Sequence, residues 1–223
     1  MTYGRTFTLW RAAAGTDWRA YTDHAFVRSL GDGSLPRAAY LHYLVQDYIF
    51  LVHFARAWAL AVTKAETIAE MRTCAATAKA LIDEEMRLHV ETCAAEGIDE
   101  AALQAAEERP ANLAYTRYVL DAGHSGDIAD LLAALAPCVL GYGEIGARLT
   151  SEAGSKTYSD WIGTYGGADY QTLCAEVGAL IDGAVTRRLG PAPQDCPRWP
   201  DLCRRFTTAT RLEIGFWDMG LAP

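Results

Sequence analysis

The sequence lacks the cysteine and histidine patterns of metal-finger and redox proteins. None of its six cysteines forms a CxxC pair, the spacing that binds zinc or carries thioredoxin-type chemistry. Only five histidines are present, and none follows His124. We therefore expect free thiols, most of them filling the core, and no bound metal.

Long apolar runs and basic clusters are also missing. No stretch of 18 or more uninterrupted apolar residues occurs, so a membrane-spanning helix is not expected. The net charge is −8 and no basic block stands out, which argues against a nucleic-acid partner. The first 18 residues lack the apolar core of a signal peptide. These absences predict a cytoplasmic protein without a membrane or nucleic-acid partner.

The composition is that of one globular, all-α domain spanning residues 1–223. Hydrophobic residues make up 51% of the chain and charged residues 22%. Strand-like alternation is scarce, and apolar residues recur at intervals of three and four. Seven or eight helices packed as a bundle are expected. The predicted helical ranges are 36–64, 67–93, 111–122, 127–149, 155–163, 168–189 and 201–219.

Asp47 lies in YLVQDYIFLVHFARAWAL, a stretch that is hydrophobic on more than one helical side. A buried carboxylate needs a partner or a cavity. Tyr43, Phe50 and Phe54 share its helical face. A carboxylate flanked by rings suits a pocket for a flat, polar heterocycle, with Tyr43 and Phe50 among the contacts. The alternative is an Asp bonded to another helix's backbone or to an arginine such as Arg56.

Cys138 lies in LAPCVLGYGEIG, and Tyr142 follows four residues later on the same helical face. A thiol beside a tyrosine hydroxyl suits nucleophilic catalysis. The glycines of this segment weaken a helix, so we expect neighbours that require their small size: Gly141, Gly143 and Gly146. The alternative is a core cysteine in a closely packed helix.

Glu213 lies in LEIGFW and shares a helical face with Phe216 and Trp217. Partial desolvation by these rings would raise its pKa into a useful acid–base range. The alternative is a glutamate at the solvent edge of an amphipathic helix. Three tyrosines can either point a hydroxyl into a site or fill the bundle: Tyr115, Tyr118 and Tyr165.

His89 is the residue that most resembles a helical metal ligand, since it lies four residues after Glu85. The Glu-x-x-His spacing of di-iron bundles is absent, because Met86 stands three residues before His89. We expect His89 to be a structural hydrogen-bonding residue.

Four segments together resemble the TenA family, the thiaminase II enzymes: YLVQDYIFLVHFARAWAL, LLAALAPCVLGYGEIG, WIGTYGG and EIGFW. The resemblance covers almost the whole chain in order. It implies a haem-oxygenase-like helical bundle without haem, assembled as a homotetramer. It also implies a hydrolase that needs no cofactor. Such an enzyme releases 4-amino-5-hydroxymethyl-2-methylpyrimidine from its 5-aminomethyl analogue, a salvage reaction, or from thiamine.

The resemblance also assigns residue roles. Cys138 matches the family nucleophile, Glu213 the acid–base glutamate, and Asp47 the carboxylate that recognises the aminopyrimidine. At Phe50 relatives can carry tyrosine, so stacking is kept while one hydrogen bond is lost. The pocket tyrosines that it implies are Tyr115, Tyr142 and Tyr165.

Two other functions compete with this interpretation. The first is an iron-dependent oxygenase or decarboxylase on the same fold, which needs several histidine and carboxylate ligands around one cavity. The histidine-free C-terminal part argues against it. The second is a protein that binds an aminopyrimidine without converting it, which would show affinity without product.

Overall fold

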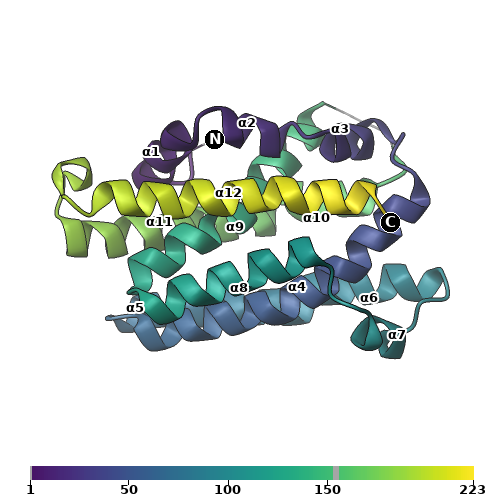
Figure 1. The fold of residues 1–223 in the computed structure, drawn as a ribbon, viewed down its shortest axis with the longest axis horizontal. Helices are drawn as coiled ribbons and strands as arrows, with labels where there is room; N and C mark the ends of the chain where they lie inside the picture. The colour runs from purple at the N-terminus through teal and green to yellow at the C-terminus, as the bar shows by residue number, and fades with distance from the viewer. Residues whose placement is uncertain (1, 153–155) are drawn as a thin grey trace.

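The computed structural model describes residues 2–152 and 156–223, which form twelve α-helices and two short helical segments of other types (Figure 1). No strand occurs in these residues, so the predicted all-α class is confirmed. The long helices are α4 (Arg37–Lys64), α8 (Pro110–Ser125), α9 (Ile128–Ser151), α11 (Ala168–Leu189) and α12 (Trp199–Leu221). Each matches a predicted range to within a few residues.

The remaining predicted ranges need adjustment. The helix expected over 67–93 is a continuous stretch of α5 (Ile68–Ala80), the π-helical segment η1 (Leu81–Glu85) and α6 (Met86–Ala95). The helix expected over 155–163 is α10 (Ser159–Gly166), and Ser155 lies outside the described residues. Several short elements were not predicted: α1 (Arg5–Ala14), α2 (Thr16–Thr22), α3 (Ala25–Asp32), α7 (Glu100–Ala105) and the 3-10 turn η2 (Pro193–Asp195).

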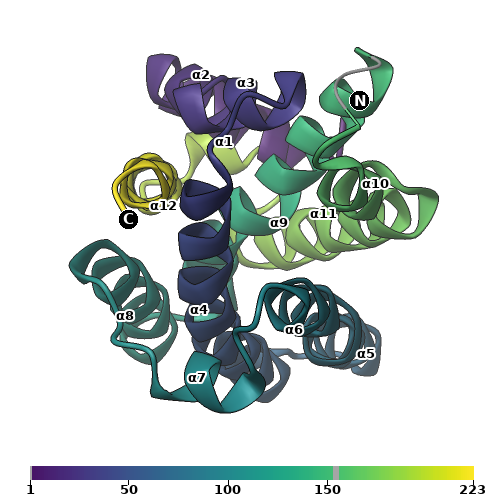
Figure 2. The ribbon, with the colours of Figure 1, turned by 90° about the vertical axis from the view of Figure 1, so that its right-hand side faces the viewer.

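The helices surround α4 and α9. Figure 2 looks along α12, and in it α4 runs down the middle of the molecule between α8 on one side and α5 and α6 on the other. Helix α9 packs against α8, α10, α11 and α12. It is the one helix in the described part that is long and apolar enough to cross a membrane. However, 94% of its most apolar window is buried within the bundle, which identifies it as the core helix.

The start of α9 is fixed by a capping box that is tied to α12. The Asp127 carboxylate accepts a hydrogen bond from the Ala129 amide at 2.8 Å, and the Asp130 carboxylate accepts one from the Asp127 amide at 3.0 Å. Arg198, the residue before α12, donates to Asp127 Oδ2 at 2.6 Å and also binds Asp130. These contacts hold α9 in register with α12.

The three glycines of α9 lie where neighbouring groups come too close for a side chain. A Cβ at Gly141 would overlap the Tyr21 ring, and one at Gly146 would overlap the Tyr165 backbone. At Gly143 a Cβ would lie 2.5 Å from Cys174 Sγ. The expected close packing is therefore confirmed, and it sets α10 directly against α9.

Candidate active site

Three buried carboxyl groups from three segments surround Cys138 of α9. Asp47 comes from α4, Glu85 from the end of η1, and Glu213 from α12. The three side chains belong to residues only 2%, 7% and 1% exposed, and Cys138 is 7% exposed. Charged groups are almost never fully buried without partners, so each carboxyl group calls for an account of its contacts.

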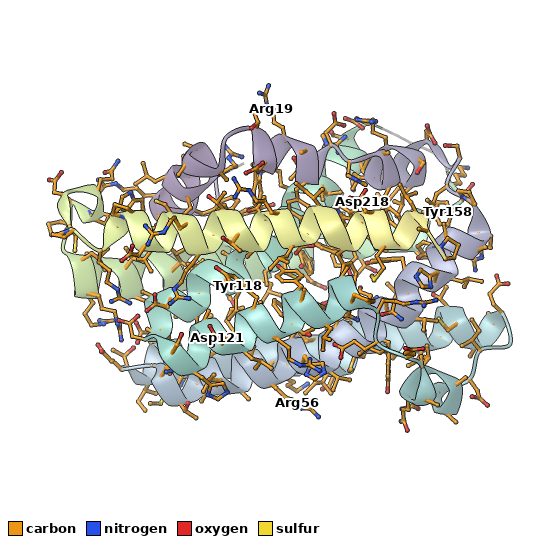
Figure 3. All side chains as sticks on the ribbon, viewed as in Figure 1. Arg19, Arg56, Tyr118, Asp121, Tyr158 and Asp218 are labelled. Carbon is orange, nitrogen blue, oxygen red and sulfur yellow. The ribbon has the colours of Figure 1, made fainter. Side chains whose placement is uncertain are left out.

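Asp47 is paired with His89 and not with an arginine. Its Oδ2 atom lies 2.7 Å from His89 Nε2 and accepts a hydrogen bond from the Tyr43 hydroxyl at 2.9 Å. Arg56, the partner considered from the sequence, points outward from the bundle (Figure 3). The Trp161 indole donates to the Tyr43 hydroxyl at 3.2 Å, which orients that hydroxyl toward Asp47.

The protonation of His89 follows from its two contacts. Nδ1 lies 2.7 Å from the Glu85 backbone oxygen, which can only accept, so Nδ1 carries hydrogen. Burial lowers the pKa of His89, but the hydrogen bond and the charge of Asp47 raise it by more than burial lowers it, so the net shift is upward. Both ring nitrogens of His89 thus lie beside oxygen acceptors, which favours the imidazolium form with Nε2 donating to Asp47. In the described residues no hydrogen bond occupies the second oxygen of Asp47, Oδ1.

Glu213 is held by a tyrosine from α8. The Tyr115 hydroxyl donates to Glu213 Oε1 at 2.8 Å. Burial raises the pKa of Glu213 well above its ordinary value; the Tyr115 hydrogen bond opposes this shift, and the charge of Asp47 adds to it. Burial therefore favours the protonated form of Glu213, as its apolar neighbours predicted, and the residue is not a solvent-edge glutamate.

Glu85 forms a second tyrosine–glutamate pair on another side of Cys138. The Tyr165 hydroxyl donates to Glu85 Oε1 at 2.6 Å. Burial and the charge of Asp47 raise the pKa of Glu85 to about 7, against the opposing effects of Tyr165 and His89. This carboxyl group can therefore change its protonation near neutral pH.

Cys138 is a thiol in the resting protein. Burial raises its pKa well above the usual range, and the nearby charges of Glu213, Glu85 and Asp47 raise it further. A thiol of this kind attacks only if its proton is removed as the new bond forms. The site provides carboxyl groups that can accept that proton.

Aromatic rings form the walls of the site. Phe50 packs against Tyr115 with ring centroids 4.9 Å apart and against Phe216 at 5.4 Å. Tyr142 packs edge-on to Tyr165 at 4.9 Å and also contacts Trp217 at 5.3 Å. Such rings suit a flat heterocycle.

The structure thus brings together the eight residues that the sequence and the family resemblance assigned to the site: Tyr43, Asp47, Phe50, Tyr115, Cys138, Tyr142, Tyr165 and Glu213. Tyr118, in contrast, fills the space between α8 and α12, where its hydroxyl donates to the Arg205 carbonyl at 3.4 Å (Figure 3). Two further residues contact this site but were not assigned to it from the sequence, Glu85 and His89. Their spacing of four residues in IDEEMRLHV was the available signal.

A cleft of about 730 Å³ lies between η1–α6 and α10–α11, and Glu85 and Tyr170 are on its wall. Within the described residues, no group of three or more His, Cys, Asp or Glu side chains is placed to hold a metal ion.

Comparison with known proteins relates the whole chain to one family. A sequence model of the TENA/THI-4/PQQC family matches residues 11–222. An uncharacterized protein of Haemophilus influenzae is 40% identical over 207 residues, which are 92% of this chain and 93% of that one. The aminopyrimidine aminohydrolase of Halalkalibacterium halodurans is 32% identical over 205 residues, 91% and 89% of the two chains.

Solved structures confirm the fold. A crystal structure described as a TenA family transcription regulator from Silicibacter sp. TM1040 superposes with a TM-score of 0.97 and 62% identity, covering 99% of this chain and 98% of that one. A Shewanella denitrificans domain with a heme oxygenase-like fold superposes with a TM-score of 0.55 at 13% identity, covering 96% and 90% of the two chains. The predicted haem-oxygenase-like bundle is therefore correct.

Proposed function

Because the chain belongs to the TENA/THI-4/PQQC family, we propose that it is a hydrolase of thiamine metabolism. It releases 4-amino-5-hydroxymethyl-2-methylpyrimidine, either from the 5-aminomethyl pyrimidine or from thiamine. The observation that carries the proposal is a buried thiol, Cys138, among carboxyl groups that each bind the protein through one oxygen. The name of the Halalkalibacterium halodurans relative supports the same reaction.

Recognition of the pyrimidine begins at Asp47. Its Oδ1 atom accepts a hydrogen bond from the exocyclic amine of the ring, while His89 and Tyr43 hold Oδ2. The ring lies against aromatic side chains, including Phe50 and Tyr142. Because Tyr43 and His89 both contact Oδ2, the free oxygen Oδ1 is left to accept, so this end of the site selects a hydrogen-bond donor.

Covalent attack uses Glu213 as a proton carrier. Glu213 gives its proton to a ring nitrogen, which makes the ring electrophilic. Its new carboxylate then takes the proton of the Cys138 thiol as Sγ bonds to a ring carbon. The thiol has thus added across the ring, and Glu213 is again an acid.

Departure of the leaving group completes the reaction. Electron density from the adduct moves into the ring–methylene bond, and the bond from the methylene carbon to the leaving nitrogen breaks. Water adds to the methylene carbon, with Tyr142 placed to orient it, and its released proton goes to the departing amine or, with thiamine, to solvent. The Sγ–carbon bond then breaks: Glu213 gives its proton to Sγ and takes back the proton of the ring nitrogen, which restores the thiol, the acid and the alcohol product.

The test is ammonia release from 4-amino-5-aminomethyl-2-methylpyrimidine, measured in parallel with thiamine cleavage. Cys138→Ala should lower kcat by roughly 1,000-fold or more, because the nucleophile is lost. Cys203→Ala, a half-buried cysteine far from these reactions, should leave kcat unchanged. Retention of most activity in Cys138→Ala would rule out the covalent route. Pyrimidine binding by the folded wild type without turnover would instead identify a binding protein.

We also propose that the enzyme is a cytoplasmic homotetramer without a nucleic-acid or membrane partner. The net charge of −8 supports the absence of nucleic-acid contact. Two large apolar side chains on α5–η1, Ile68 and Ile82, are 61% and 53% exposed, and association of chains would cover them.

A further inference from the structure

Glu85 is a buried acid that the steps above do not use. Oε1 accepts the Tyr165 hydrogen bond, whereas Oε2 accepts none in the described residues. Glu85 ends the π-helical segment η1, and such segments frequently occur at functional sites. Its charge acts on Cys138, so it lies within electrostatic range of the reacting thiol.

Glu85 also connects this site to the 730 Å³ cleft. Of the three carboxyl groups around Cys138, it alone lines the cleft; Asp47 and Glu213 do not. Glu85 therefore belongs both to the site and to the wall of the cleft, and its second oxygen accepts no hydrogen bond in the described residues.

The cleft is strongly acidic. Its wall carries four further carboxylates, Glu84, Glu91, Asp169 and Glu176, against a single arginine, Arg87. Arg87 is itself paired with Glu91 at 3.4 Å. A cleft of one charge sign concentrates ions of the opposite sign. The ligand expected to pass through this cleft is therefore a small cation.

We propose that Glu85 is the catalytic group that binds the leaving amine of the substrate, and that the acidic cleft is the route of that nitrogen into and out of the site. The inference rests on the proposed function. It assigns the two tyrosine–glutamate pairs to opposite ends of the substrate, Glu213 to the ring and Glu85 to the leaving group.

The proposed release of the amine conserves protons and electrons. The substrate amine binds as an ammonium group paired with the Glu85 carboxylate. The carbon–nitrogen bond breaks, its electron pair goes to nitrogen, and ammonia departs, while the ring adduct supplies electrons to the carbon. Water then bonds to that carbon, and its proton passes to Glu85. Ammonia takes this proton and leaves as ammonium, so Glu85 returns to a carboxylate.

Thiamine provides the contrast that tests this role. Its thiazole leaves as a neutral molecule and requires no proton. Removing the Glu85 charge should therefore damage amine release far more than thiamine cleavage. If Glu85 acted only by adding negative charge to the acidic cleft, its loss would instead affect both substrates alike, because both are cations.

The experiment compares Glu85→Gln with Glu100→Gln, the same change at an exposed carboxylate of α7 outside the cleft. Glu85→Gln should lower kcat/KM for the aminomethyl pyrimidine by roughly 100-fold and for thiamine by less than about 10-fold. Glu100→Gln should change both by no more than about threefold, the effect of one screened surface charge. Equal losses on the two substrates, or no loss, would overturn the role of Glu85. An inactive wild type would overturn the proposed function as well.

Measuring ligand affinity apart from turnover shows whether Glu85 binds the ammonium group of the substrate before any bond breaks. In a Cys138→Ala background, Glu85→Gln should weaken binding of the aminomethyl pyrimidine by at least about 10-fold. Binding of the hydroxymethyl pyrimidine, which has no ammonium group, should be unchanged. Equal weakening of both ligands would contradict the assignment. If the Gln variant does not fold, Glu85→Asp keeps the charge and should preserve the preference between the two ligands.

Discussion

At the scale of single residues, the Asp47–His89 pair is the most costly element of the site to disturb. Both side chains are almost fully buried, with 3% and 0% exposure. Two charges removed from water remain stable only because each satisfies the other, so loss of one leaves an uncompensated charge. The pair is therefore both a recognition element and a stability element.

Asp47→Asn should lower the free energy of unfolding by about 3 kcal/mol, because His89 loses its counter-charge. Tyr43→Phe removes the hydrogen bond to the same oxygen and the acceptor of the Trp161 indole but no charge, and should cost about 1–2 kcal/mol. Guanidinium denaturation at fixed pH measures both values. A smaller loss in Asp47→Asn than in Tyr43→Phe would contradict the ion pair.

The pH dependence of this difference has a definite sign. Burial lowers the pKa of His89, but Asp47 raises it above the unfolded value, so the pair stabilises the fold fully below the unfolded pKa of about 6.5. The stabilisation is lost as pH rises through the folded pKa. The difference between wild type and Asp47→Asn should therefore be largest in mild acid and shrink toward alkaline pH.

The sequence could predict part of the site at this scale. Asp47, Cys138 and Glu213 stand out because each is a polar or reactive group in an apolar segment. Glu85 does not, because it lies among charged residues in IDEEMRLHV, which resembles a solvated helix face. The π-helical turn makes the difference: it exposes Ile82 and buries Glu85, the reverse of what polarity alone would indicate.

At the scale of elements, the long helices were predictable because their apolar period extends over many turns. The helices α1, α2, α3 and α7 have only six to ten residues each, too few turns for a clear pattern. Their positions come from tertiary packing, as where Phe7 and Trp10 of α1 pack on Phe206 of α12.

The capping box of α9 gives a prediction at this scale. Asp127→Ala removes the N-cap bonds and the Arg198 contact, and should cost about 1–2 kcal/mol at neutral pH. Burial would raise the pKa of Asp127, but Arg198 and the capping amides lower it to about 2. The carboxylate therefore stabilises the fold above pH 4, and this contribution is lost as pH falls toward 2.

Chemical denaturation at pH 7 and pH 3 checks the cap. The loss caused by Asp127→Ala should be smaller at pH 3. Asp121→Ala provides the control, because that side chain lies on the exposed face of α8, and it should change stability by less than about 0.5 kcal/mol. An equal effect of the two substitutions would mean that the box does not stabilise α9.

At the scale of the whole molecule, the proposed tetramer should appear as a particle of four 24.3 kDa chains in light scattering or sedimentation. The double variant Ile68→Glu/Ile82→Glu places charges on the exposed apolar part of α5–η1 and should yield smaller particles. The matched double change at Leu113 and Leu221, the other large apolar residues that are exposed in the described part of the chain, should leave the particle size unchanged. A monomeric wild type would contradict the tetramer.

The hydrogen bonds of the site join distant parts of the chain. Glu85 and Tyr165 are 80 residues apart, Tyr115 and Glu213 are 98 apart, and Tyr43 and Trp161 are 118 apart. Contacts of such long range are slow to form. Since α12 is synthesised after α9, a nascent chain contains Cys138 before its acid partner Glu213. Turnover therefore reports completed folding, and an unfinished chain has only an ordinary thiol.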